Sequence, residues 1–291
     1  MFRGTYTAII TPFKVGKVDE PGLERLIKSQ IKGGVEGIVP VGTTGESPTL
    51  TYEEHIHVIA RSIEMAAGRI KVMAGTGGNS TNEAVYLTKE AERAGADASL
   101  QVAPYYNKPT QEGLYQHFKT IARATKLPII LYSIPGRCGI EIALETVQRL
   151  AKDCKNIVGI KEAGGAPDRV SALRGALGPD FAIFSGDDSL TLPFMAVGAD
   201  GVISVASNIV PKEVAQMVRL FAAGNVRGAM KLHAKFFPVF RTLFIETNPV
   251  PVKAALAMKG LIQEEYRLPL VKMQPKNREL LRQTLEACGV R

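Results

Sequence analysis

The chain has 291 residues, 45% of them hydrophobic and 22% charged, which is typical of a globular protein with one large domain and a sizeable core. Its formal net charge is +8, but the basic residues are scattered and form no run interleaved with aromatic residues. This composition argues against a nucleic-acid partner and favours anionic small molecules as ligands.

The cysteines and the N-terminus indicate the cellular compartment. Cys138, Cys154 and Cys288 are odd in number and widely spaced, which argues against a disulfide framework and favours a reducing environment. Residues 1–5 contain no apolar signal-peptide segment, and no apolar run approaches membrane-spanning length. We therefore expect a cytoplasmic protein with no membrane partner.

Short apolar runs that end in turn residues predict eight strands. They are expected at Tyr6–Ile10, Gly37–Val41, Ile70–Ala74, Ala98–Val102, Pro128–Tyr132, Ile157–Lys161, Phe181–Ser185 and Gly201–Ser204. Helical patterns lie between them. Asp19 and Pro21 begin the first helix, Thr51 and Glu54 form a capping box for the second, and Ser80 caps the third.

Strand and helix alternate with a period of about thirty residues, as a (β/α)₈ TIM barrel requires. A doubly wound open sheet would alternate similarly, but it usually has fewer strands and a switch-point fingerprint. After Gly224 only helices are predicted. We therefore expect a catalytic barrel over residues 1–224 and a C-terminal α-helical domain over residues 225–291.

The predicted strand at 157–161 ends in Lys161, which is followed by turn residues. A lysine at the end of a strand buried on both faces is held out of water, and burial lowers its pKa from about 10.4 towards neutrality. The neutral amine can then attack a carbonyl carbon. The alternative is that Lys161 reaches solvent or pairs with Glu162, as an arbitrary lysine would.

Polar residues follow two other predicted strands, and the carboxyl ends of barrel strands meet at the active site. Thr43 and Thr44 lie in a glycine-flanked loop whose hydroxyls and amides can hold an anion, although a tight turn with a helix cap is the alternative. Tyr132 ends the strand next to that of Lys161, about 4.8 Å away. Arg137, on the following loop, can bind a carboxylate or remain solvated at the surface.

Other motifs predict neither a metal nor a cofactor. Residues 75–79 are glycine-rich but lack the third glycine of a dinucleotide fingerprint. Asp187 and Asp188 have no neighbouring histidine and are predicted to cap the next helix. The four histidines show neither HxH nor HExxH spacing.

The lysine, tyrosine, paired threonines and arginine together indicate imine chemistry on a keto acid. The threonine loop would hold the carboxylate, and Lys161 would condense with the ketone to form a protonated Schiff base that permits enamine formation. Tyr132 would move protons.

Three segments support this interpretation: Gly37–Glu46 (GIVPVGTTGE), Leu131–Arg137 (LYSIPGR) and Ile160–Glu162 (IKE). They resemble the pyruvate-dependent class I aldolase superfamily and, within it, the dihydrodipicolinate synthase family. The resemblance extends over nearly the whole chain. It implies condensation of pyruvate with L-aspartate 4-semialdehyde, the step that commits carbon to diaminopimelate and lysine.

The resemblance also implies catalytic roles. Lys161 matches the Schiff-base lysine and Tyr132 the central proton-transfer tyrosine. Thr44 matches the threonine that links two tyrosines in a proton relay. Tyr106 matches the relay tyrosine that reaches across a dimer interface into the neighbouring site, so a homodimer would be the smallest active unit. A homotetramer built as a dimer of dimers is common in the family.

For the substrates, the resemblance implies that Thr43 and Thr44 bind the pyruvate carboxylate and that Arg137 positions the semialdehyde carboxylate. The backbone at Gly186 and Ile203 would line the site.

Many family members are inhibited by lysine at a dimer-interface pocket, and eight residues match its positions. They are Ser47, Pro48, Leu50, Tyr52, His55, Asn79, Glu83 and Tyr105. Tyr52 stands where lysine-sensitive members have histidine, and Pro48 where they have a small residue. The resemblance thus makes L-lysine a candidate effector.

Two other functions share part of this pattern. A sister aldolase for sialic acid or 2-keto-3-deoxy sugar acids would keep Lys161 and Tyr132, but Arg137 favours a short carboxylated aldehyde over a polyol. A non-catalytic barrel that senses a keto acid is disfavoured by the joint presence of Lys161, Tyr132, Tyr106 and Thr44.

Overall fold

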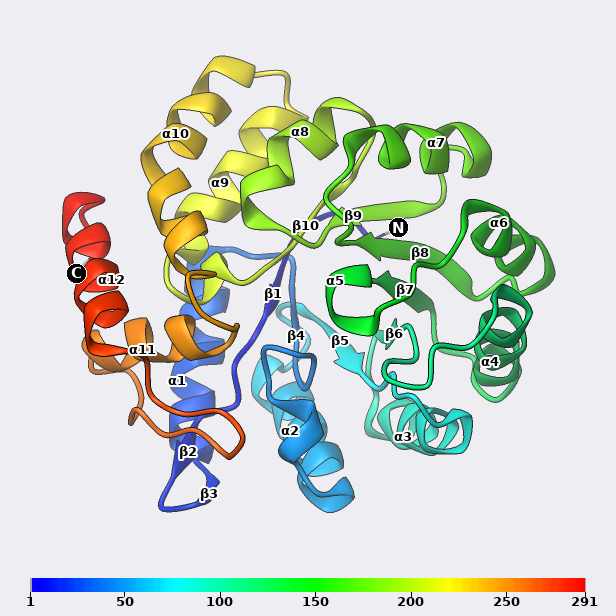
Figure 1. Cartoon of the computed structure of the whole chain (residues 1–291), viewed down its shortest axis with the longest axis horizontal. Coiled ribbons are helices and arrows are strands. Elements are labelled where there is room, and N and C mark those ends of the chain that lie inside the picture. The colour runs from blue at the N-terminus through cyan, green and yellow to red at the C-terminus, as the bar shows by residue number, and fades with distance from the viewer. Residues whose placement is uncertain (1, 291) are drawn as a thin grey trace.

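A computed structural model of the chain describes residues 2–290 and shows a closed barrel of parallel strands with helices outside it (Figure 1). The barrel strands are β1 (Gly4–Ala8), β4 (Gly37–Val39), β5 (Lys71–Gly75), β6 (Ala98–Val102), β7 (Ile129–Ser133), β8 (Ile157–Glu162), β9 (Ala182–Ser185) and β10 (Gly201–Ser204). β1 pairs with both β4 and β10, which closes the sheet. The predicted (β/α)₈ TIM barrel is confirmed, and an open sheet is excluded.

The first two strands end earlier than predicted, for identifiable reasons. β4 stops at Val39 because Pro40 has no N–H to donate to the ladder. β1 stops at Ala8, and the amide of Ile10 donates instead to the side chain of Asn208 at 3.2 Å. A small antiparallel hairpin, β2 (Phe13–Lys14) and β3 (Lys17–Val18), follows β1 and was not predicted.

The helices around the barrel follow the expected order. They are α1 (Glu20–Gly33), α2 (Tyr52–Ala66), α3 (Thr81–Ala94), α4 (Gln111–Arg123), α6 (Leu144–Asp153), α7 (Pro167–Leu177), α8 (Thr191–Ala196) and α9 (Pro211–Ala222), with the short helices α5 (Pro135–Cys138), η1 (Ser47–Thr49), η2 (Asp188–Leu190) and η3 (Ala206–Asn208) in loops. The capping box at the start of α2 is confirmed: the hydroxyl of Thr51 accepts from the Glu54 amide at 3.2 Å, and the Glu54 carboxylate accepts from the Thr51 amide at 3.1 Å.

Three C-terminal helices complete the chain: α10 (Val226–Thr242), α11 (Val250–Met258) and α12 (Pro275–Ala287). They gather on one side of the barrel, beside α1 and α9 (Figure 1). Their apolar faces share a continuous core with those two helices, including Leu26, Val218, Phe240 and Leu256. The connection from α10 to α11 contains Asn248, which contacts Thr44 in the loop after β4 and Arg137 on α5. The domain boundary at residues 224 and 225 stays a prediction.

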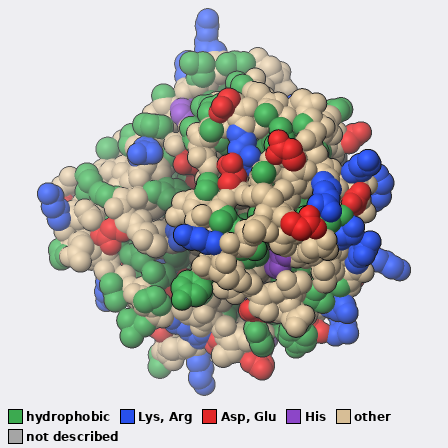
Figure 2. Space-filling view, turned by 45° about the vertical axis from the view of Figure 1, so that its right-hand side comes forward, with side chains coloured by type: hydrophobic (Ala, Val, Ile, Leu, Met, Phe, Trp, Pro, Cys, Tyr) green, Lys and Arg blue, Asp and Glu red, His purple; other side chains and the backbone are tan. Residues whose placement is uncertain are grey.

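The surface agrees with the scattered basic residues of the sequence. On the face shown in Figure 2, Lys and Arg side chains are dispersed among acidic and apolar ones. Among residues 2–290, no helix combines the length and the apolar character needed to cross a bilayer.

Candidate active site

Lys161 lies inside the barrel, on β8. Its backbone is in register with Tyr132 on β7 and with Phe184 on β9. The residue is 5% exposed, and Nζ lies 4.2 Å from the centre of the Tyr132 ring. The amine and the phenol predicted to work together are thus neighbours in the structure.

The surroundings of Lys161 favour the neutral amine. Burial lowers the pKa of Lys161 to about 7, because the ammonium form loses its hydration. The negative charge of Asp188 opposes this shift, and the positive charge of Arg137 adds to it. Burial also raises the pKa of the Tyr132 phenol, so Tyr132 holds its proton at neutral pH.

The loop after β4 brings two threonine hydroxyls to the same place. It is a tight turn, in which the amide of Gly45 donates to the Gly42 carbonyl at 3.0 Å. A side chain at Gly45 would lie 2.9 Å from the backbone of Val41, so glycine is required there. The side chain of Thr43 interacts with the Tyr132 phenol and opposes the rise of its pKa, whereas the hydroxyl of Thr44 accepts from Asn248 Nδ2 at 3.0 Å.

This arrangement bears on the predicted proton relay. The resemblance assigned the tyrosine-linking role to Thr44, but the threonine that contacts the Tyr132 hydroxyl is Thr43. Successive residues in a turn point in different directions, so the motif alone does not distinguish the two hydroxyls. Thr44 is 3% exposed and faces the connection between α10 and α11 instead.

A cavity of about 50 Å³ joins most of the predicted residues. Its lining includes Thr43, Thr44, Tyr132, Arg137, Lys161 and Gly186. A side chain at Gly186 would lie 3.1 Å from Cε of Lys161, so glycine keeps this side of the amine open. Ile203 is buried in the barrel core and does not line this cavity or the larger cavity described next.

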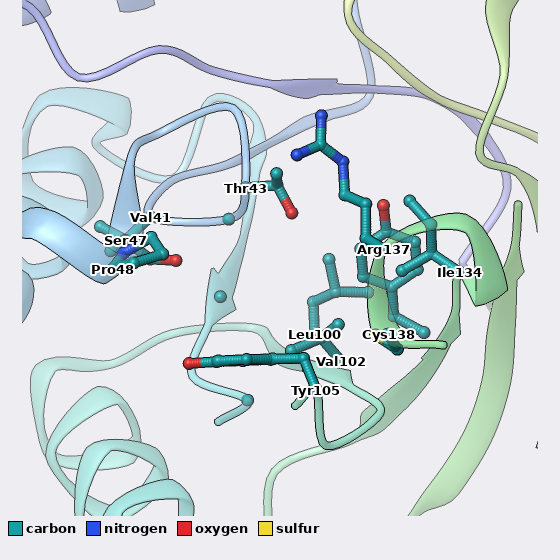
Figure 3. Close-up of a pocket in the computed structure, with 14 residues that line it drawn as sticks. Val41, Thr43, Ser47, Pro48, Leu100, Val102, Tyr105, Ile134, Arg137 and Cys138 are labelled. Atoms are coloured by element: carbon teal, nitrogen blue, oxygen red, sulfur yellow. The ribbon is translucent and has the colours of Figure 1, made fainter. Parts of the chain in front are cut away.

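A larger cavity of about 220 Å³ adjoins the first and shares Thr43, Tyr132 and Arg137 with it. Figure 3 shows Thr43 and Arg137 on one side of this space and the Tyr105 ring on the other. Arg137 lies on α5, where its Nη2 donates to the backbone carbonyl of Asn248 at 3.0 Å. The guanidinium is therefore fixed beside the amine.

Tyr106 is separate from these cavities. It lies on the loop after β6, is 91% exposed, and has a backbone φ of 72°. Left-handed backbone is unfavourable for a tyrosine and tends to persist where function requires it. Tyr106 lines neither cavity, so within one chain it contributes no contact to the site.

The candidate effector residues are only partly grouped around a cavity. Ser47, Pro48 and Tyr105 line the larger one. Two others contact its lining: Asn79 donates to the Tyr105 carbonyl at 3.1 Å, and His55 Nε2 donates to the Gly75 carbonyl at 2.7 Å. Five of the eight line neither cavity: Leu50, Tyr52, His55, Asn79 and Glu83.

Two residues of the site were missed by sequence reasoning. Asp187 caps η2, as predicted, by accepting from the Ser189 amide at 2.7 Å. The same prediction for Asp188 is wrong, because its buried carboxylate accepts from the Val205 amide at 3.0 Å. The negative charge of Asp188 also raises the pKa of Lys161. Its position just after a barrel strand was an available signal. Asn248 had none, because it lies in the helical region.

The comparisons with known proteins agree with this geometry. Residues 1–288 match the Dihydrodipicolinate synthetase family. Over 291 residues the chain is 54% identical to the 4-hydroxy-tetrahydrodipicolinate synthase of Persephonella marina, which covers 100% of this chain and 99% of that relative.

Solved structures give the same result. The 4-hydroxy-tetrahydrodipicolinate synthase of Methylacidiphilum fumariolicum SolV matches with a TM-score of 0.98 at 58% identity, over 99% of this chain and 96% of that one. The dihydrodipicolinate synthase of Aquifex aeolicus matches with a TM-score of 0.98 at 52% identity, over 99% of both chains. The chain therefore belongs to the dihydrodipicolinate synthetase family, whose members are lyases of the class I aldolase type.

Proposed function

We propose that Lys161 forms the Schiff base with pyruvate in the 4-hydroxy-tetrahydrodipicolinate synthase reaction. The activity itself follows from family membership: pyruvate condenses with L-aspartate 4-semialdehyde on the diaminopimelate route to lysine. The observation that supports the role of Lys161 is its burial against Tyr132, which gives a neutral amine near pH 7 inside a closed barrel. Such a biosynthetic enzyme is expected in the cytoplasm.

The chemistry follows from the neighbouring groups. The neutral Nζ of Lys161 attacks the ketone carbon of pyruvate, and uptake of one proton with loss of water gives a protonated imine. The hydroxyls of Thr43 and Thr44 hold the carboxylate. The imine withdraws electrons, so a methyl proton leaves and an enamine forms. Tyr132 is placed to shuttle protons during these steps. The chloride-inhibited synthase of Acinetobacter baumannii, 48% identical with a TM-score of 0.97, was solved with pyruvate.

Arg137 receives the second substrate. Its guanidinium is fixed by the Asn248 carbonyl and borders both cavities, so it can bind a carboxylate beside the enamine. The enamine carbon then attacks the aldehyde. The larger cavity, which shares Thr43, Tyr132 and Arg137 with the cavity of Lys161, has room for this second molecule.

Tyr106 acts in a second copy of the chain. Its exposure and left-handed backbone suit a side chain that projects from the surface. The larger cavity adjoins Tyr132 and Thr43, so a partner's tyrosine entering it would reach the relay. A homodimer is then the smallest active unit, and a dimer of dimers is the proposed assembly.

L-Lysine is the proposed effector. The synthase of Cyanidioschyzon merolae, 42% identical with a TM-score of 0.97, was solved with lysine bound. Asn79, Glu83 and Tyr105 could bind the amino-acid groups of such a ligand. Tyr52 packs near Tyr86, with 6.0 Å between ring centres, and would alter the pocket relative to a histidine.

Borohydride reduction tests the central role. Treatment of the wild-type protein with pyruvate and sodium borohydride should add one reduced pyruvate adduct to the peptide that contains Lys161. The Lys161→Ala variant should remain unlabelled, whereas the Lys155→Ala variant, altered at an exposed lysine, should label normally. Labelling of another lysine would remove Lys161 from this role.

A further inference from the structure

Asn248 lies in the connection between α10 and α11 and contacts groups assigned to both substrates. It is 6% exposed and lines the cavity that contains Lys161. Its side-chain Nδ2 donates to Thr44 Oγ1 at 3.0 Å, and its backbone carbonyl accepts from Arg137 Nη2 at 3.0 Å. The two contacts use different parts of Asn248, so a side-chain substitution removes one and leaves the other.

The contact with Asn248 determines how the Thr44 hydroxyl uses its hydrogen. A threonine hydroxyl has a single hydrogen and can both donate and accept. Because Oγ1 of Thr44 accepts from the amide of Asn248, its own hydrogen is free to be donated elsewhere. A carboxylate only accepts hydrogen bonds. Thr44 is therefore preset as a donor to an anion.

A second observation concerns the other end of the same amide. Oδ1 of Asn248 is buried and has no hydrogen-bond partner within the described chain. An unpaired buried carbonyl oxygen costs stability, and such groups in native proteins call for an explanation. Orientation of the Thr44 hydroxyl supplies one, because an apolar side chain at this position would avoid the cost but lose the donor.

We propose that Asn248 is a positioning residue for pyruvate, which turns the Thr44 hydroxyl hydrogen towards the keto-acid carboxylate. The inference rests on the proposed role of Thr44 in binding that carboxylate. Arg137 is fixed by the backbone of residue 248, so the side chain of Asn248 affects pyruvate and not the semialdehyde. The C-terminal region thus completes the pyruvate site of the barrel.

Kinetics of the Asn248→Ala variant test the proposal. The KM for pyruvate should rise about tenfold, the size expected for loss of a hydrogen bond to a charged group. The KM for the semialdehyde should stay within about twofold of the wild-type value. Equal increases in both constants, or no change in the pyruvate constant, would overturn the proposal.

The Asn248→Asp variant keeps the shape of the side chain and reverses the hydrogen bond. Its carboxylate accepts from Thr44, takes the hydrogen away from pyruvate and repels the substrate anion. The pyruvate KM should therefore rise more than in the alanine variant, by about a hundredfold. If the alanine variant fails to fold, this isosteric variant decides the question alone, and an unchanged pyruvate KM would reject the proposal.

A double-mutant cycle separates positioning from a general loss of structure. If Asn248 acts only through the Thr44 hydroxyl, Asn248→Ala should have no further effect on pyruvate KM in a Thr44→Val background. Effects that multiply would show that Asn248 acts independently of Thr44 and would contradict the proposal. Borohydride trapping of the wild-type protein tests the role of Lys161 alone. A failure of the Asn248 proposal can therefore be distinguished from a failure of the proposed function.

Discussion

At the residue scale, the protonation states in the site depend on how far burial removes a few side chains from water. Lys161 is buried, it forms no salt bridge with any residue between positions 2 and 290, and burial lowers its pKa to about 7. Asp188 opposes this shift from the loop after β9, while its own carboxylate accepts from the Val205 and Ala206 amides at 3.0 and 2.9 Å. The loop after β9 therefore both shapes the cavity wall and tunes the amine.

This pKa predicts the pH dependence of imine formation. Below about pH 7, Lys161 is increasingly protonated and cannot attack, so the trapping rate with pyruvate should fall roughly tenfold per pH unit. Above that pH the rate should level off, because the amine is already neutral. Rapid-quench borohydride trapping between pH 5.5 and 9 measures the profile. A rise that continues towards pH 10 would show a solvated lysine instead.

Arg137 gives a second prediction at this scale. The Arg137→Ala variant should raise the KM for the semialdehyde by about a hundredfold and that for pyruvate much less, because the guanidinium is proposed to bind only the second carboxylate. Steady-state assays with each substrate varied in turn measure the two constants. Arg123→Ala, altered at an exposed position on α4, is the matched control. Equal effects on both constants would reassign the residue.

At the element scale, the threonine loop is held from the C-terminal side. Glu46, at the end of this loop, has a φ of 56° and forms a fully buried ion pair with Lys253 on α11. Nζ of Lys253 also lies 4.3 Å from the centre of the Phe13 ring. Burial lowers the pKa of Lys253, and the charge of Glu46 opposes that shift. Breaking the pair would leave a buried charge uncompensated.

The Lys253→Met variant should therefore lower the free energy of unfolding by about 3–5 kcal/mol. The Glu46→Gln/Lys253→Met double variant should lose less than the sum of the two single losses, because neither charge is left alone. Urea unfolding monitored by circular dichroism measures these differences. Lys276→Met, at an exposed position on α12, should have almost no effect. A similarly small loss for Lys253→Met would show that Glu46 finds another partner.

At the scale of the whole molecule, one copy of the chain does not bring the proposed second tyrosine of the relay to its own site. Tyr106 is exposed on the loop after β6, away from the cavities of its own chain. The barrel, the C-terminal helices and a second copy would then each contribute to one site. Under the proposed function, oligomerisation would be a requirement for catalysis.

Mixed oligomers test this requirement. Tyr106→Phe and Lys161→Ala should each be nearly inactive alone, but their hybrids should recover activity because some sites contain an intact Lys161 and a partner's intact Tyr106. Hybrids purified with two different affinity tags allow the assay to be restricted to verified mixtures. No recovery in such hybrids would contradict the shared site.

The local patterns of the sequence predicted most of the fold and the chemical class. Apolar runs separated by helical periods indicated the barrel, because buried parallel strands need apolar side chains on both faces. Lys161 and Tyr132 were predicted as site residues for the same reason: a polar group at the end of an apolar strand is unusual. The strand boundaries at Ala8 and Val39 and the β2–β3 hairpin depended on local hydrogen bonding that the patterns missed.

The tertiary structure decided what lies far apart in the chain. Asn248 donates to Thr44 across 204 residues, and Lys253 pairs with Glu46 across 207. The sequence contains no periodic signal for such contacts, because they depend on where α11 packs against the end of the barrel. Which of two adjacent threonine hydroxyls contacts Tyr132 also depends on the geometry of a turn. By itself the sequence determined the barrel and the buried position of Lys161 at the end of a strand, because both follow from local burial. Only the packed structure fixed how the remaining polar groups surround that amine.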